Sequence, residues 1–469
     1  MVYDVAELTI DVSSSLRDVM QTIDKTGFGV AFITDDSGLV GVVTDGDVRR
    51  GIIAGVDLDA SIERVMNENP IILYDHWDEK RRHRELEARD AGEKVRDHTH
   101  LVVPVLDGDD AVVDMAFYTR RGELAGEIDQ HNGPVNTVLV VGGAGYIGSA
   151  LTALLLKHGY EVKVLDNAVY GTHGIRQYFD EDSFTFIEGD MRSIETVTDA
   201  IESVDAVVHL GALVGDPASD ISPQKTLEIN YHSTQMIANV CKYHQINRFV
   251  FASTCSVYGK SENPETLLTE QTELNPVSLY AKTKIKSEEA LLDLADGNFS
   301  PTILRMATIY GLSDRMRFDL VVNILNAKAY FEGEIPIFGG EQYRPNVHVR
   351  DAARAYISVL KAPIEDVDSE IFNVGATEQN YQIKQLGEQI AEVYPESEID
   401  WHRDKEDERS YQVDFSKIED VLGYETEETI ESASRELRAA FEAGRFEDYT
   451  DEKYNNYETL EGSTIFGPE

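Results

Sequence analysis

Six short apolar runs alternate with helical stretches between residues 137 and 307. The runs are TVLVVGG, YEVKVLD, FTFIEGD, AVVHLGA, RFVFAST and PTILRMA, and a segment of helical character separates each from the next. Continuous apolar runs are typical of strands that are covered on both faces, and intervening helices favour parallel pairing. The pattern predicts a doubly wound α/β domain built on a parallel sheet.

A shorter pattern occurs twice in the first 122 residues. A helix, two strands around a turn and a second helix are indicated by SSSLRDVMQTIDKTG, GVAFITDD, GLVGVVTDGD and DVRRGIIAG. After Asn69 and Pro70 the order partly recurs in WDEKRRHRELEARDAG and HLVVPVLDGDDAVVDMAFYTR. A recurrence at about sixty residues indicates an internal duplication. We therefore expect a repeated module at 1–122, a polar linker at 123–135 and the α/β domain at 136–469.

The charge of the chain narrows the choice of partners. Its 469 residues carry 42 Lys+Arg against 86 Asp+Glu, a formal net charge of -44 at pH 7. Nucleic acids and anionic membranes attract clustered positive charge, so neither is an expected partner. The bases comprise 25 Arg and 17 Lys. Many carboxylates with few lysines suit a halophile's protein in molar salt, because salt screens the self-repulsion. An ordinary, very acidic mesophilic protein is the alternative.

The expected location is the cytoplasm. Cys241 and Cys255 are the two cysteines of the sequence, which fits a reducing compartment without a disulfide framework. The N-terminus MVYDVAELTIDV has neither a basic region nor an apolar core of an export signal. The uncharged stretch 137–156 is interrupted by four glycines, which favours a strand, a turn and a helix start over a membrane span.

A glycine-rich turn follows the first apolar run of the α/β domain. VLVVGGAGYIGSALTALLL places Gly142, Gly145 and Gly148 between a strand and a helix. A missing Cβ permits close approach to a pyrophosphate, and the helix start offers N–H donors. Asp166 follows eighteen residues after Gly148, where a carboxylate can accept from a ribose 2′-OH. Asp166 would repel a 2′-phosphate and no Arg follows it closely, so NAD is favoured over NADP, and the next residue, Asn167, leaves this inference intact.

Asp190 allows two interpretations. It closes FTFIEGDMR, where a third strand would end near the adenine of a bound dinucleotide. It could equally be the N-cap of a helix formed by SIETVTDA. The sequence alone leaves both open.

A tyrosine and a lysine stand four residues apart in SLYAKTK. In a helix, Tyr280 and Lys284 share a face, so their side chains can converge. A free phenol has a pKa near 10, and a nearby cation would lower it toward that of a usable general base. The preceding run FASTCSVYG ends a fifth strand at Ser253 and Thr254. Together with the glycine turn, this order predicts a dehydrogenase-type site.

The chain resembles extended short-chain dehydrogenase/reductases, specifically nucleotide-sugar epimerases and dehydratases, over about residues 136 to 445. The resemblance rests on GGAGYIG, VLDN, GDMR, HLGALVGDP, EINY, FASTCSVYG, LYAKTK, RMATIYG, RPNVHVRDAARA and IFNVGA. It implies a Rossmann sheet with a small C-terminal substrate-binding subdomain, NAD as cofactor, no metal and a nucleotide-sugar substrate. The cofactor contacts it implies are Gly142, Gly145, Tyr146, Ile147, Gly148, Asp166, Asn167, Asp190, Met191, Leu210, Gly211, Ala212, Tyr280 and Lys284.

The resemblance also implies catalytic and substrate-binding roles. Tyr280 is then the general base, Lys284 positions the nicotinamide ribose and lowers the tyrosine pKa, and Thr254 hydrogen-bonds the reacting sugar hydroxyl. Arg344 matches a position that holds the substrate diphosphate, a role that suits a guanidinium. Arg409 is either a second phosphate ligand or a member of a surface ion pair.

This sequence departs from the family pattern at positions that distinguish the family's reactions from one another. The 4,6-dehydratases carry an acidic pair where this chain has Cys255 and Ser256, and decarboxylating relatives place a Glu in the same loop. Thr308 replaces a frequent Asn and Leu312 a frequent Pro, which puts some sugar and nucleotide contacts in doubt. A base and a hydride acceptor without an extra acid favour epimerisation. A net dehydrogenase or 4-ketoreductase, and a non-catalytic NAD and adenylate sensor, are the alternatives.

The duplicated N-terminal module resembles a tandem CBS pair. The resemblance rests on GVVTDGDVRR, VMNENPI and the VPV of residues 103–105. It implies that Thr44 and Asp47 hold the ribose hydroxyls of an adenine nucleotide, whereas the second repeat lacks the matching residues. A CBS pair kept for dimerisation or packing, without a ligand, is the alternative.

A homodimer or larger homo-oligomer is expected, since CBS pairs commonly dimerise. NYHSTQMIANVCKYH and LYAKTKIKSEEALLDL could pack as an isologous four-helix interface. Their apolar positions fit that face and would fit packing on the sheet equally well: Met236, Ile237, Val240 and Leu291.

Overall fold

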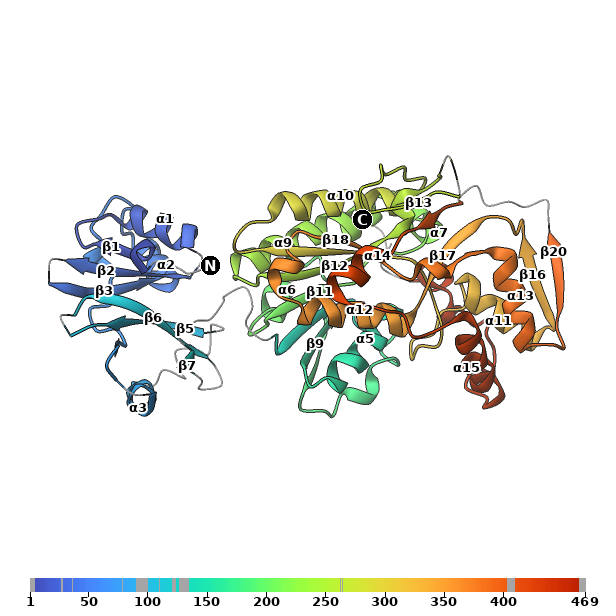
Figure 1. The fold of residues 1–469 in the computed structure, drawn as a ribbon, viewed down its shortest axis with the longest axis horizontal. Coiled ribbons are helices and arrows are strands. Elements are labelled where there is room, and N and C mark those ends of the chain that lie inside the picture. Colours follow the sequence, from blue (N-terminus) through green and yellow to red (C-terminus); the bar gives the residue numbers. More distant parts are fainter. Residues whose placement is uncertain are drawn as a thin grey trace. The chain divides into compact units, whose positions relative to one another are not determined.

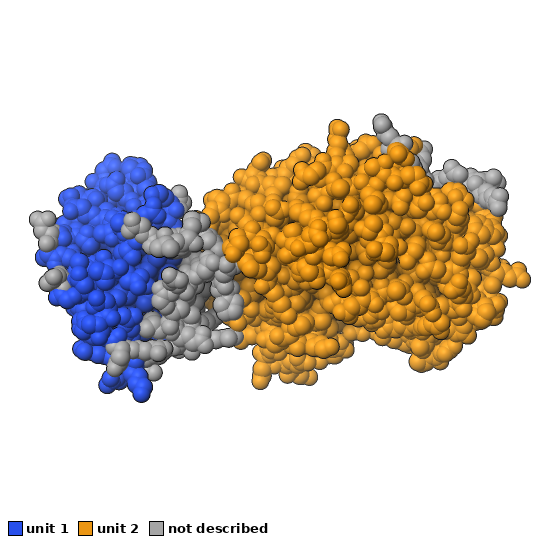
Figure 2. Space-filling view, viewed as in Figure 1, with its two compact units in different colours: residues 1–133 blue, residues 134–469 orange. Residues whose placement is uncertain are grey.

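The protein is described here by a computed structural model. It describes residues 5–26, 28–35, 37–77, 79–89, 100–108, 110–119, 124–125, 135–261, 263, 265–402 and 410–463. The chain forms two compact units, residues 1–133 and residues 134–469 (Figure 2). Among the described residues, no helix is both long and apolar enough to cross a membrane.

The second unit is built on a seven-stranded parallel sheet, as predicted (Figure 1). The strand order is β10-β9-β8-β11-β12-β14-β18, so the chain reverses direction across the sheet next to β8. The seventh strand was not expected, because a run of four residues carries too little periodicity. The strands are β8 (Thr137–Val141), β9 (Glu161–Asp166), β10 (Phe184–Glu188), β11 (Ala206–His209), β12 (Arg248–Thr254), β14 (Ser300–Met306) and β18 (Ile371–Val374).

Helices cover both faces of this sheet. One face packs against α5 (Tyr146–Lys157) and α12 (Val349–Lys361), and the other against α6 (Ile194–Ala200), α9 (Ser233–Tyr243) and α10 (Leu279–Leu294). Three of the positions considered for an intersubunit face lie in the core between these helices and the sheet: Ile237, Val240 and Leu291. Met236 is partly buried against the same core. For Ile237, Val240 and Leu291 the alternative, packing within the chain's own core, is therefore the one that holds, and self-association of the chain stays a prediction.

A smaller lobe is formed by segments that precede and follow β18 in the chain, in the C-terminal part where a subdomain was expected. It contains the three-stranded sheet β15-β17-β19 and the two-stranded sheet β16-β20. Its core joins α11 (Val321–Phe331), α13 (Ile383–Val393) and α15 (Ile430–Glu442). The strands are β15 (Thr308–Tyr310), β16 (Glu334–Phe338), β17 (Tyr343–His348), β19 (Asn380–Gln382) and β20 (Glu398–His402).

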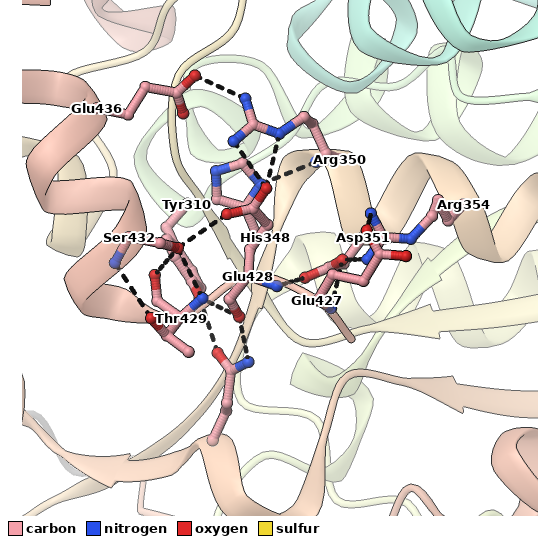
Figure 3. A network of polar contacts seen from close by, with 11 residues as sticks. Tyr310, His348, Arg350, Asp351, Arg354, Glu427, Glu428, Thr429, Ser432 and Glu436 are labelled. Carbon is pink, nitrogen blue, oxygen red and sulfur yellow. Dashed lines mark hydrogen bonds and ion pairs between the residues drawn. The ribbon is translucent and has the colours of Figure 1, made fainter. Parts of the chain in front are cut away.

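A polar network ties this lobe to the helix layer of the sheet (Figure 3). At the start of α12, Arg350 binds Glu428 Oε1 through Nη2 at 2.8 Å and Glu436 Oε1 through Nη1 at 2.7 Å. Asp351, fully buried, accepts hydrogen bonds from the backbone N–H groups of Glu427 and Glu428. The loop before α15 and α15 itself are thus joined to α12 by hydrogen bonds.

The first unit contains the duplicated pattern. Its first repeat has the sheet β1-β2-β3 with α1 and α2, and its second has β4-β5-β6-β7 with α3. The two repeats share a core that includes Phe28, Phe32, Val102 and Phe117. The elements are β1 (Thr9–Asp11), α1 (Leu16–Thr26), β2 (Val30–Asp35), β3 (Gly38–Thr44), α2 (Asp45–Ile53), β4 (Leu73–Tyr74), α3 (Glu79–Ala88), β5 (His100–Leu106), β6 (Val112–Thr119) and β7 (Leu124–Ala125).

Candidate active site

The glycine turn, residues 142–148, forms a cradle, in which Gly142 lies against the backbone of Gly211 and Gly148 against that of Gly142. Gly142 has φ +82°, and a Cβ there would lie 2.6 Å from the nitrogen of Gly211. A Cβ at Gly148 would lie 2.5 Å from the oxygen of Gly142. Gly145 is the N-cap of α5 and has no side chain to satisfy the first N–H groups of the helix. The turn therefore combines a surface without side chains with a positive helix end, which suits a pyrophosphate.

Asp166 ends β9 beside this turn. Its carboxylate accepts hydrogen bonds from the backbone nitrogens of Ala144 at 3.0 Å and Ala168 at 2.9 Å. Burial raises the pKa of Asp166, and these two hydrogen bonds oppose that rise. A carboxylate has about four lone-pair sites, so capacity remains for a ribose hydroxyl.

Asp190 follows the end of β10, the neighbour of β9 in the sheet, and does not cap a helix. The N-cap of α6 is Ser193, whose side chain accepts from the nitrogen of Thr196. Asp190 instead pairs with Arg192, with Oδ2 2.6 Å from Nη2. The alternative interpretation of Asp190 as that cap is therefore wrong.

One cleft brings the predicted residues together. All of the residues expected to contact the cofactor line it, from Gly142 and its neighbours to Tyr280 and Lys284, and Thr254 lines it too. Further lining comes from Ser253, Ser256, Thr308 and Tyr411. The cleft lies where the carboxyl ends of β8, β9, β11 and β12 meet, the usual ligand position in an open α/β sheet.

Tyr280 and Lys284 lie in the first turns of α10, which begins after the N-cap Ser278. Burial raises the pKa of Tyr280 to about 12, whereas the charge of Arg317 and a side-chain hydrogen bond with Thr254 lower it. Burial lowers the pKa of Lys284 to about 7, and its Nζ donates to the oxygen of Ala252 at 2.6 Å. The Lys284 Nζ lies 5.9 Å from the centre of the Tyr280 ring, so its expected effect on the phenol stays a prediction.

A buried ion pair lies next to the segments that carry Thr254 and Lys284. Glu288, one turn after Lys284, binds Arg305 Nη2 at 2.7 Å, and both side chains are 3% exposed. Ser253 donates a hydrogen bond to Glu288. Because Ser253 precedes Thr254 on β12, the pair fixes the end of that strand relative to α10. The sequence analysis did not identify this support.

Two arginines were predicted to bind the substrate, and the structure describes one of them. Arg344, on β17, is nearly buried, and its Nη1 donates to the oxygen of Tyr343 at 2.8 Å. Its guanidinium lies 5.7 Å from the ring of Tyr411, which lines the cleft. Arg344 therefore borders the cleft through Tyr411. Arg409 lies outside the described residues.

The cleft also contains polar residues that were not predicted. Arg315 and Arg317 come from the loop after β15, and Asn456 begins α16 (Asn456–Glu461) near the C-terminus. The backbone nitrogen of Asn456 lies 3.3 Å from Asp319 Oδ2, and Asp319 in turn pairs with Arg317. Two arginines in DRMRF were a usable signal in so acidic a chain. Nothing in the sequence marks Asn456.

Comparison with known proteins assigns the second unit. Residues 138–375 match the model of the NAD dependent epimerase/dehydratase family. The chain belongs to this family. The resemblance expected from the motifs is thereby confirmed, and NAD is the cofactor of the family. The glycine cradle, the buried Asp166 and the Tyr280–Lys284 pair fit this cofactor, since they offer a side-chain-free turn, a ribose acceptor and a cationic group in one cleft.

Individual family members show the same relationship. A UDP-glucose 4-epimerase of Lactobacillus helveticus is 33% identical over 258 residues, covering 51% of this chain and 76% of that protein. The structure of the Bacillus cereus UDP-glucuronic acid 4-epimerase with UDP-glucuronic acid and NAD is 25% identical. It covers 66% of this chain and 100% of its own, with a TM-score of 0.58. The Thermotoga maritima UDP-glucose 4-epimerase with UDP-glucose is also 25% identical at the same coverage, with a TM-score of 0.59.

The N-terminal resemblance is confirmed for the first repeat, whereas the assignment of the second repeat as a CBS domain stays a prediction. A CBS domain model matches residues 2–54, which contain the first repeat. Within it, Thr44 is the N-cap of α2, and its Oγ1 donates to Asp47 Oδ2 at 2.6 Å. The other oxygen of Asp47 accepts from Arg50 Nη2 at 2.7 Å. The two predicted nucleotide contacts are thus adjacent and form a capping box.

Proposed function

We propose that the protein is an NAD-dependent epimerase of nucleotide-diphosphate sugars that acts through a transient keto-sugar. Family membership and the 4-epimerase names of the similar proteins support the reaction class. The observation that carries the proposal is the pairing of Tyr280 with Thr254 in the cleft that also contains the glycine cradle.

The groups next to Thr254 argue against dehydration. Cys255 is buried and its Sγ lies 3.2 Å from the oxygen of Arg305, so it faces the core. Burial raises the pKa of the Cys255 thiol well above its ordinary value, which removes it as an acid for a leaving hydroxyl at neutral pH. Ser256 lines the cleft but has no acidic proton. The loop thus lacks the carboxylates that expulsion of a sugar hydroxyl needs.

The residues of the cleft have different roles in the oxidation of the sugar. Thr254 holds the reacting sugar hydroxyl against the oxygen of Tyr280, which accepts the hydroxyl proton as the carbonyl forms. The charge of Arg317 and the hydrogen bond with Thr254 oppose the effect of burial on the tyrosine pKa and favour the phenolate that this step needs. When bound, NAD supplies the hydride acceptor and afterwards the hydride donor. Tyr280 then returns the proton to the oxygen after the keto-sugar has presented its opposite face. Lys284 donates to the oxygen of Ala252, which keeps its Nζ 5.9 Å from the centre of the Tyr280 ring.

The test is the conversion of UDP-sugars by the full chain. Incubation with UDP-glucose is expected to give an equilibrium mixture with UDP-galactose by NMR, with no net accumulation of NADH. Tyr280→Phe is expected to lower kcat by at least about 100-fold, since general base catalysis contributes that much or more. Tyr243→Phe is the matched control, because that phenol is 70% exposed and lies on α9 outside the cleft.

Three outcomes would reject the proposal. Stoichiometric NADH from a panel of nucleotide sugars would identify a net dehydrogenase. NAD binding without conversion of any sugar would favour the sensor. Unchanged turnover in Tyr280→Phe would remove that residue from the reaction.

We further propose that the CBS unit has a regulatory or oligomerising role. The adjacent hydroxyl of Thr44 and carboxylate of Asp47 could contact a vicinal diol if Arg50 gave up its bond. Titration with AMP and ATP, compared between the natural chain and Asp47→Asn, tests the ligand. Size-exclusion chromatography with light scattering tests self-association. No nucleotide binding together with a monomer would reject both roles.

A further inference from the structure

A buried guanidinium with two unpaired nitrogen atoms lines the cleft. Arg315 is 1% exposed, and its Nε and Nη2 have no hydrogen-bond partner within the described part of the chain. Its side chain lines the same cleft as the glycine turn. The guanidinium carbon lies 4.3 Å from the centre of the Tyr170 ring, a contact that packs the group but satisfies none of its N–H donors.

The nearby carboxylates of Asp166 and Asp319 favour the charged form of this group, but both are engaged with other partners. Asp319 is engaged with Arg317 at 2.8 Å, and the oxygens of Asp166 accept backbone hydrogen bonds. No ion pair joins Arg315 to a carboxylate in the segments that the structure describes. Burial and the neighbouring Arg317 lower the pKa of Arg315 to about 10, so the group is still charged at neutral pH. A buried charge of this kind is costly unless an anion completes its environment.

The position of Arg315 indicates which anion that is. A Cβ at Gly174 would lie 3.0 Å from the Cβ atoms of both Arg315 and Ser149, so the arginine backbone and the first turns of α5 pack on the same point. The start of α5 suits an anion, because its N-cap Gly145 makes no side-chain hydrogen bond to the first N–H groups of the helix. Arg344, the expected ligand of the sugar diphosphate, is not among the residues that line the cleft, and its guanidinium lies 5.7 Å from the ring of Tyr411.

We propose that Arg315 is a ligand for the pyrophosphate of the bound dinucleotide, acting with the N-terminal turn of α5. The guanidinium supplies two donors in a planar fork, and a diphosphate offers acceptors in matching geometry. The inference rests on NAD as cofactor and is independent of which sugar is converted. It also identifies a cation that lets an anionic cofactor enter a chain with a net charge of -44.

Direct binding to the full chain, after removal of co-purified cofactor, tests this role. ADP-ribose carries the pyrophosphate, whereas adenosine carries no phosphate. Arg315→Gln is expected to weaken ADP-ribose binding about 10- to 100-fold by calorimetry, the range of one or two charge-assisted hydrogen bonds. Adenosine binding, measured by competition, and UDP binding should change less than about 2-fold. Arg315→Lys should restore part of the ADP-ribose affinity.

Thermal unfolding separates ligand binding by Arg315 from a purely structural role. If Arg315 binds the pyrophosphate, removal of its unpaired buried charge should leave the thermal midpoint of the ligand-free protein unchanged or raise it, while the shift of that midpoint produced by ADP-ribose shrinks. Arg176→Gln, an exposed position on the segment after β9, is the control and should alter neither value.

Each contrary outcome overturns the assignment. Equal weakening of adenosine and ADP-ribose with a lower ligand-free midpoint would mean that Arg315 only supports the fold. Weakening of UDP alone would assign it to the substrate diphosphate. No change at all would mean that it contacts neither. Epimerisation by way of Tyr280 would survive any of these results, so the two proposals fail separately.

Discussion

Alanine substitutions at three glycines distinguish two costs to stability. One is the strain of a positive φ, and the other is the clash of an added Cβ with neighbouring backbone in the glycine turn. Gly142 and Gly159 both have φ +82°, a conformation that costs an L-residue about 1–2 kcal/mol. At Gly142 an added Cβ would also lie 2.6 Å from the nitrogen and 2.7 Å from the Cα of Gly211, whereas at Gly159 it would meet nothing within 4 Å. Gly297 has neither the strained φ nor a neighbour within 4 Å.

The expected losses of stability follow from this comparison. Gly159→Ala should cost about 1–2 kcal/mol from strain alone. Gly142→Ala should cost about 1–3 kcal/mol more, because two backbone segments must separate. Gly297→Ala should be close to neutral, within about 0.5 kcal/mol. Since separating the backbones of Gly142 and Gly211 opens the cradle, Gly142→Ala should also weaken NAD binding, and Gly159→Ala should not.

Denaturant unfolding followed by fluorescence gives the stability, and calorimetry gives the NAD affinity. The chain has two units and can show more than one transition, so the transition of the second unit is identified as the one that NAD displaces. If Gly142→Ala were no more destabilising than Gly159→Ala, the close approach to Gly211 would be wrong. Equal NAD affinity in both variants would remove the cradle from the cofactor site.

Three further predictions concern charge. Arg317 lowers the pKa of Tyr280, so Arg317→Gln should raise that pKa and move the acidic limb of the kcat–pH profile to higher pH; an unmoved limb would exclude this coupling. Glu288→Gln should destabilise the protein by about 3–5 kcal/mol, because it leaves Arg305 buried and unpaired. The exposed pair of Glu431 is the comparison, where Glu431→Gln should cost less than about 1 kcal/mol in the same unfolding assay. Affinity for the nucleotide sugar should improve with salt up to molar concentration, whereas tightest binding at low ionic strength would contradict the halophilic origin proposed for this acidic chain.

Local spacing explains why much of the fold and cleft could be predicted from the sequence. The apolar runs indicated six of the seven strands of the large sheet. The glycine turn and Asp166 lie at consecutive strand ends, and such ends meet at one edge of a parallel sheet. Tyr280 and Lys284 share one helix, so their proximity follows from helix geometry. Thr44 and Asp47 are adjacent for the same local reason.

The remaining features depend on contacts between distant segments. Arg315 and Asn456 reach the cleft from a loop of the small lobe and from the last described helix, and no spacing rule links them to the glycine turn. The partners of Arg305 and Glu288 also come from different elements. Apolar patterning could not separate an intersubunit face from the core at Ile237 and Leu291, since both environments select the same side chains.

The place of Asn456 in the cleft has a practical consequence for recognising this enzyme from fragments. The family match ends at residue 375, yet Tyr411 and Asn456 complete the lining of the cleft well beyond that point. A piece trimmed to residues 138–375 would keep the glycine cradle, Tyr280 and Lys284 and still lack part of the wall around the ligands. Catalytic motifs and ligand enclosure are thus encoded in different stretches of the chain, and a search confined to the motifs would mistake an open fragment for a whole site.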